Sequence, residues 1–163
     1  MSSCTLVVAV AAAPGPARAQ DVGIPLGSVP DDAAVETLDG DAASLSRWTG
    51  DGPVVVEFWA RWCEVCEALQ PQLDAAFERF GDRVAFVAVA VGVNQSPRSV
   101  RRHLGRHPVP YPVVWDADGA AVRAYKAPAT GYVVILDDEG RVAYTAVGER
   151  QDVIAALERI VGE

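Results

Sequence analysis

Two cysteines separated by two residues are the first feature of this sequence with evident chemistry. The segment FWARWCEVCEALQP (Phe58–Pro71) carries Cys63 and Cys66, two of the three cysteines in the 163-residue chain. Such a pair can bind a metal ion, attach a haem, cross-link the fold or exchange electrons with another thiol. The rest of the sequence discriminates among these four roles.

Three of the four roles fit the sequence poorly. A structural zinc site takes four ligands, and the chain has no second CxxC motif. Attachment of a c-type haem needs His directly after the second cysteine, where this chain has Glu67. A structural bridge between Cys63 and Cys66 would close a loop too short to remove much entropy from the unfolded chain.

Thiol–disulfide exchange fits the local pattern. The run VVVEFWA (Val54–Ala60) is apolar at nearly every position, which is typical of a strand covered on both faces. Helical spacing begins at Cys63, and a helix N-terminus favours a thiolate through its free N–H groups and its dipole. Because only the thiolate attacks a disulfide, we expect Cys63 to be the more exposed cysteine and the attacker. Cys66, one turn further, would resolve the mixed disulfide.

Strands and helices alternate along the rest of the chain. A lead-in with a turn at Asp39-Gly40 comes first, and Pro71 is expected to kink the helix that begins at Cys63. The patterns predict strands over 54–60, 83–93 and 111–116, helices over 63–80, 96–107, 119–126 and 151–162, and a hairpin over 132–148. This order predicts an α/β domain of three layers with a mixed central sheet.

The first twenty residues differ from the remainder. TLVVAVAAAPGPARAQ (Thr5–Gln20) resembles the apolar region and small-residue cleavage site of a secretory signal peptide, although no Lys or Arg precedes it. Its apolar run is far shorter than the roughly 20 residues that cross a bilayer. We expect residues 1–20 to be a signal peptide or a disordered tail and residues 21–163 to form the α/β domain. The mature chain is expected to be periplasmic or otherwise extracytoplasmic, without a membrane span.

Charge excludes one class of partner. The formal net charge is −8, and the densest basic stretch, VRRHLGR (Val100–Arg106), is interpreted as a solvated helix face. A nucleic-acid surface concentrates Lys and Arg, so we expect no nucleic-acid partner.

The motif VVVEFWARWCEVC resembles the thioredoxin-superfamily pattern strand–FWAxWCxxC–helix, with a proline five residues after the second cysteine, where Pro71 stands. From about residue 27 to residue 163 the chain is similar to the TlpA/ResA branch of exported thiol-disulfide oxidoreductases. The resemblance rests on a Gly-containing lead-in before the first core strand and on an extra segment over residues 93–125. It implies a thioredoxin-like three-layer sandwich with an N-terminal lead-in and a central strand–helix insertion.

The resemblance also implies roles for individual residues. Cys63 would be the nucleophile and Cys66 the resolving thiol, and the two would form a disulfide when oxidised. Trp62 would border the active-site surface. Glu57 stands where thioredoxins place a buried acid that exchanges a proton with the second cysteine, although an ion-paired or edge-facing residue would fit equally. Neither a cofactor nor a metal is needed, because the cysteines carry the electrons.

Two departures from the family bear on function. Glu64 and Val65 lie between the cysteines, where many relatives have Pro before the second one. A negative charge at Glu64 disfavours a thiolate on Cys63, and both changes indicate a reducing rather than an oxidising couple.

The second departure concerns the loop before the hairpin, where the family places a cis-proline that faces the CxxC motif and pairs with the substrate backbone. Pro128 is predicted to be this cis-proline, but it lies about three residues farther from the hairpin turn than the usual pattern. Alternatively, that position falls on Thr130-Gly131 and the cis-proline is absent. The substrate-binding loop is expected to comprise Pro128, Ala129, Thr130 and Gly131.

The sequence thus predicts an exported disulfide reductase that acts on protein disulfides or thiols. The resemblance implies apocytochrome c as one substrate. A membrane or periplasmic thiol donor would restore the two thiols. One alternative is a peroxiredoxin-like thiol peroxidase with Arg61 or Arg123 beside the reactive cysteine. Another is a copper- or metal-carrying binding module that uses the two cysteines and a histidine, His103 or His107.

Overall fold

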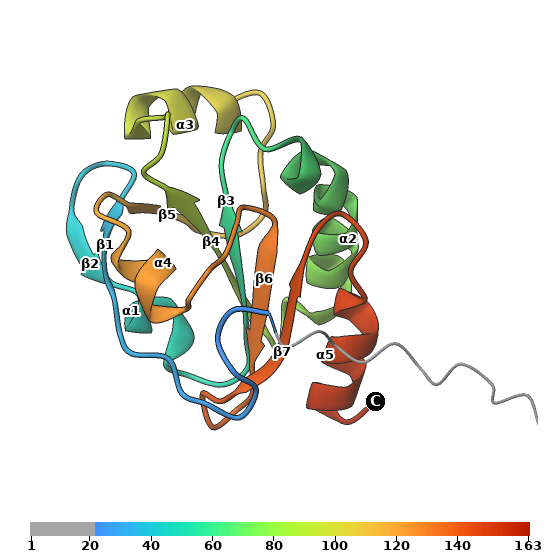
Figure 1. Ribbon diagram of the computed structural model, residues 1–163. Helices are drawn as coiled ribbons and strands as arrows, with labels where there is room; N and C mark the ends of the chain where they lie inside the picture. The colour runs from blue at the N-terminus through green and yellow to red at the C-terminus, as the bar shows by residue number, and fades with distance from the viewer. Residues whose placement is uncertain (1–21) are drawn as a thin grey trace, which may run out of the picture.

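The structure is a computed structural model that describes residues 22–163 (Figure 1). The predicted signal peptide or disordered tail over residues 1–20, and its cleavage site, lie outside the described residues. Within residues 22–163, no helix has the length and apolar character needed to cross a membrane.

The elements follow the predicted order and differ from the prediction mainly by a few residues at their ends. The strands are β1 (Ala34–Thr37), β2 (Ala42–Ser44), β3 (Val54–Trp59), β4 (Ala85–Val91), β5 (Val113–Asp116), β6 (Tyr132–Leu136) and β7 (Val142–Val147). The helices are α1 (Ser46–Thr49), α2 (Glu64–Phe80), α3 (Pro97–Leu104), α4 (Ala120–Ala124) and α5 (Val153–Val161). The single turn α1 was not predicted, since the sequence of the lead-in indicated only strand-like pieces.

All seven strands form one mixed sheet in the order β2-β1-β5-β4-β3-β6-β7. Strand β3 lies inside the sheet, parallel to β4 on one side and antiparallel to β6 on the other. Helices α2 and α5 lie side by side on one side of the sheet, and α4 lies on the other (Figure 1). The predicted thioredoxin-like sandwich with a mixed sheet is therefore confirmed.

The position of β3 inside the sheet explains its sequence. All of its residues are buried, because helices cover both faces and neighbouring strands pair with both edges. The ring of Phe58 packs against those of Tyr125 and Tyr132, with ring centroids 5.5 and 5.8 Å away. These tyrosines are therefore core residues. The carboxyl end of β3 leads directly into the CxxC motif.

Helix α2 packs on the sheet through a stripe at helical spacing. Its buried residues are Cys66, Leu69, Leu73, Ala76 and Phe80. Phe77 is only partly buried and packs edge-on against Phe86. Pro71 lies inside the helix, as predicted, and Gly81 caps its end.

Candidate active site

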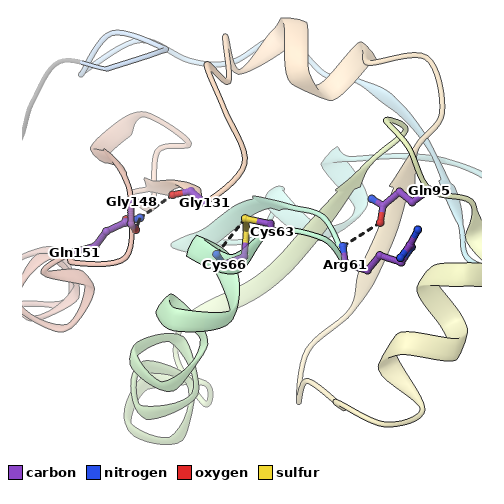
Figure 2. Close-up of a disulfide and its surroundings, with 7 residues drawn as sticks. All are labelled: Arg61, Cys63, Cys66, Gln95, Gly131, Gly148 and Gln151. Carbon is purple, nitrogen blue, oxygen red and sulfur yellow. Dashed lines mark hydrogen bonds between the residues drawn. A yellow bond between two sulfur atoms is a disulfide. The ribbon is translucent and has the colours of Figure 1, made fainter.

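Cys63 is the N-cap residue of α2. Its backbone is extended, with φ −90° and ψ 97°, and its Sγ accepts a hydrogen bond of 3.1 Å from the backbone N–H of Cys66 (Figure 2). Cys63 and Cys66 form a disulfide, with their Cα atoms 5.2 Å apart. The helix thus begins at the motif, and the N–H of Cys66, in its first turn, contacts the Cys63 sulfur.

The exposure of the two cysteines differs less than expected. Cys63 is 8% exposed and Cys66 5% exposed, so both residues are largely covered. Exposed side chains surround them: Trp62 is 43% exposed, and Val65 is also exposed. A preference for attack by Cys63 therefore rests on its place at the helix end rather than on its exposure.

The connection between β4 and α3 holds the segment that precedes Cys63. The backbone N–H of Arg61 donates a hydrogen bond of 3.0 Å to Oε1 of Gln95 (Figure 2). The indole Nε1 of Trp62 donates a hydrogen bond of 2.8 Å to the backbone oxygen of Val93. These contacts fix the approach to the motif and orient Trp62 along the surface beside it.

Glu57 is buried in the middle of β3, with 3% of its surface exposed. It pairs in register with Ala88 of β4, which offers no cation, and its Oε1 has no hydrogen-bond partner among residues 22–163. Burial, followed by the negative charge of Asp74, raises the pKa of Glu57 to about 8. The structure therefore places this carboxyl group in the interior and away from a strand edge, and within residues 22–163 it joins no ion pair.

A cavity of about 540 Å³ joins Glu57 to the two cysteines. Its wall also includes Asp74 of α2, together with His103 at the end of α3. A carboxyl group that lines a cavity shared with a thiol can exchange a proton with it directly or through water.

The loop before the hairpin differs from the prediction. The peptide bond before Pro128 is trans, since no cis bond occurs in residues 22–163, so the predicted cis-Pro128 is wrong. Gly131, with φ +75°, lies against the motif instead: a Cβ added to it would be 2.9 Å from Cγ1 of Val65 and 3.9 Å from Sγ of Cys66. The alternative, in which the position falls on Thr130-Gly131 without a cis-proline, agrees with the structure.

Residues 25–160 match the protein-family model described as Redoxin. The chain belongs to the Redoxin family. The "Thioredoxin-like protein YneN" of Bacillus subtilis is 30% identical over 132 residues, which cover 79% of this chain and 75% of that protein. The "Thiol-disulfide oxidoreductase ResA" of the same organism is 29% identical over 114 residues, which cover 70% of this chain and 63% of that protein.

Solved structures agree with this assignment. The thioredoxin domain of a thiol-disulfide oxidoreductase from Bacteroides vulgatus superposes with a TM-score of 0.71 at 20% identity, over 85% of this chain and 99% of that one. StoA from Bacillus subtilis superposes with a TM-score of 0.64 at 21% identity, over 82% and 98% of the two chains. This Redoxin protein is thus a thiol-disulfide oxidoreductase of the thioredoxin superfamily, with Cys63 and Cys66 at disulfide distance.

Two histidines of this Redoxin protein lie nearer to the cysteines than the sequence indicated. His103 and His107 line the same cavity as Cys63 and Cys66, and their rings stack with centroids 4.8 Å apart. Burial, and then the nearby His107, lower the pKa of His103. His103 belongs to α3, and His107 follows the end of that helix.

Two observations bear on the alternative functions. Within residues 22–163, no group of three or more His, Cys, Asp or Glu side chains is placed to hold a metal ion. Arg61 lines the cavity with Cys63, whereas Arg123 donates a hydrogen bond of 2.7 Å to the backbone oxygen of Asp118 at the start of α4.

Proposed function

We propose that this Redoxin protein is an exported disulfide reductase in which Cys63 attacks the target disulfide and Cys66 resolves the mixed disulfide. The observation that carries the proposal is the position of Cys63 as the N-cap of α2, with its sulfur accepting the N–H of Cys66. Backbone donors and the helix dipole at this position favour negative charge on sulfur.

The reaction balances without a cofactor. The thiolate of reduced Cys63 attacks one sulfur of the target disulfide, the target S–S bond breaks, and the other target sulfur leaves as a thiolate. Cys66 then attacks the Cys63 sulfur of the mixed disulfide and displaces the second target thiolate. Two electrons pass to the target, and the Cys63–Cys66 disulfide remains.

Glu57 is proposed to accept the proton of Cys66 in the second step. A thiol must lose its proton before it attacks. With a pKa of about 8, the Glu57 carboxyl is ionised in a minor fraction of molecules near neutral pH, and this fraction can take up the proton. The cavity shared by Glu57 and Cys66 offers the path.

The target chain is proposed to lie across the exposed surface around the disulfide. Trp62 and Val65 give this surface its apolar character. The loop of Pro128, Ala129, Thr130 and Gly131 would form its opposite side, because Gly131 contacts the motif.

Compartment and partners follow from the sequence and the family resemblance. The signal-peptide-like segment over residues 1–20 supports export, and the resemblance to the TlpA/ResA branch supports a role on exported proteins, with apocytochrome c as one substrate. A membrane or periplasmic thiol donor would then restore the two thiols after each cycle.

The test is single-turnover reduction of a peptide that contains one disulfide by the pre-reduced protein. The wild type should reduce the peptide, Cys63→Ser should be inactive, and Cys66→Ser should accumulate a mixed disulfide with Cys63, identified by mass spectrometry. Cys4→Ser, which removes the third thiol, should act like the wild type. Equal activity of Cys63→Ser and the wild type would refute the proposal.

A further inference from the structure

The side chain of Gln151, between β7 and α5, makes two hydrogen bonds beside the disulfide. Its Nε2 donates a bond of 2.8 Å to the backbone oxygen of Gly131 and another of 2.8 Å to that of Gly148 (Figure 2). Two carbonyl oxygens can only accept, so the NH₂ group of the carboxamide must be the part that faces them. Gln151 is 9% exposed, and its Oε1 is buried without a partner among residues 22–163. The side chain is thus placed for its two donor bonds.

Gly131 is the point at which these bonds reach the motif. Its carbonyl also accepts a hydrogen bond of 3.1 Å from the N–H of Gly148, and its own N–H donates a bond of 2.8 Å to the carbonyl of Phe58. Phe58 belongs to β3, the strand that leads into Cys63. Gly131 is therefore tied on one side to the strand that carries the motif and on the other to the segment after β7.

Gly131 lies in close contact with the residues of the motif. A methyl group in place of its hydrogen would overlap Cγ1 of Val65, at 2.9 Å, and would approach Sγ of Cys66, at 3.9 Å. A shift of this backbone would therefore change the surface beside Val65, at the edge of the motif. The ring constraint of a proline is absent here, so other contacts must hold the loop.

We propose that Gln151 is a positioning residue. It holds the backbone of Gly131 and the adjacent Thr130 beside the disulfide, where a polypeptide substrate would contact it. It acts through Gly131 and does not itself touch either sulfur. This inference deepens the proposed function and depends on it for its activity readout.

The experiment compares two substrates in three proteins. Gln151→Met keeps the length of the side chain and removes its donors. Gln72→Met is the matched control, since Nε2 of Gln72 donates to the backbone oxygen of Glu149 in the same connection without reaching Gly131. The substrates are a peptide that contains one disulfide and a small aromatic disulfide, which has no peptide backbone to pair with the loop.

We expect Gln151→Met to lower kcat/KM for the peptide roughly tenfold, mainly through KM, and to leave the small disulfide within about twofold of the wild type. Gln72→Met should change neither. Equal losses on both substrates, or no loss on the peptide, would overturn the proposal. Gln151→Asn, which keeps the amide but is one methylene shorter, should behave like Gln151→Met; if Gln151→Met fails to fold, this variant decides.

A wild type without activity on either substrate would refute the proposed function, and amide hydrogen exchange would then decide the role of Gln151. Exchange at Gly131 should be faster in Gln151→Met than in Gln72→Met. Equal protection at Gly131 in the two variants would overturn the positioning role.

Discussion

The backbone N–H of Cys66 donates a hydrogen bond of 3.1 Å to Sγ of Cys63, across the first turn of α2. The donor belongs to one cysteine and the acceptor to its disulfide partner. The same helical turn therefore brings the two sulfurs together and gives the Cys63 sulfur a hydrogen-bond donor. After reduction, the same N–H can stabilise a thiolate on Cys63, whereas Cys66 lies one turn inside the helix. This asymmetry gives the pair a direction of attack despite its nearly equal exposure.

Alkylation measures the asymmetry. In the reduced protein, a limiting amount of iodoacetamide at pH 7 should modify Cys63 well before Cys66, because the thiolate reacts and the thiol does not. Mass spectrometry of proteolytic peptides quantifies both sites. Equal labelling, or faster labelling of Cys66, would contradict the assignment of Cys63 as the attacker.

Replacement of Glu57 by Gln should change the pH dependence of stability. The folded state keeps a proton on Glu57 up to a pKa of about 8, whereas the unfolded chain loses it near 4.5, so stability falls as pH rises between these values. Relative to Glu57→Gln, the wild type should lose on the order of 3 kcal/mol of unfolding free energy between pH 4.5 and pH 7. Urea denaturation at a series of pH values measures this difference; parallel curves for the two proteins would show that Glu57 does not titrate in this way.

Asp74→Asn should lower the pKa of Glu57 without restoring its ordinary value. The charge of Asp74 is the second cause of the raised pKa, and burial, the first, remains in the variant. Carbon-detected NMR of the Glu57 carboxyl follows its titration. Glu78→Gln makes the same change of charge at an exposed position further along α2 and should leave the pKa of Glu57 where it is. A pKa unmoved by Asp74→Asn would refute this electrostatic coupling.

Gly131→Ala should destabilise the protein more than Gly140→Ala. Both glycines have a positive φ, +75° and +72°, but a Cβ at Gly140 meets nothing within 4 Å, whereas one at Gly131 would overlap Val65. We expect Gly140→Ala to cost about 1 kcal/mol and Gly131→Ala about 1–3 kcal/mol more. Adding Val65→Ala to Gly131→Ala should recover part of the loss; equal costs for the two single variants would rule out the contact.

Much of the fold could be predicted from local patterns. The nearly all-apolar β3, the turn residues of the hairpin and the Ser96-Pro97 start of α3 could each be assigned to an element. Burial on both faces, turn chemistry and helix capping all act over a few residues. The start of α2 at the motif could be predicted for the same reason. The turn α1 was missed because a single helical turn leaves no periodicity to detect.

The surroundings of the motif could be predicted only in part. The burial of Glu57 follows from its place in an apolar strand. The approach of His103 and His107 depends on how the chain returns from α3 to β5, over a large separation from Cys63 in sequence. Gln151 carried no signal at all, because a single glutamine before a helix is ordinary in a loop. The cis form of Pro128 was predicted by analogy with the family and failed because Gly131 takes the place beside the motif.

The reduction potential of the Cys63–Cys66 pair tests the reductase proposal more sharply than any variant. The protein would be equilibrated against dithiothreitol or glutathione buffers, and the free thiols would be trapped and counted. A potential near that of thioredoxin, about −270 mV, is the predicted result for a reductant that a thiol donor recharges. A potential near about −120 mV would identify an oxidant that installs disulfides and would contradict the proposed direction of electron flow.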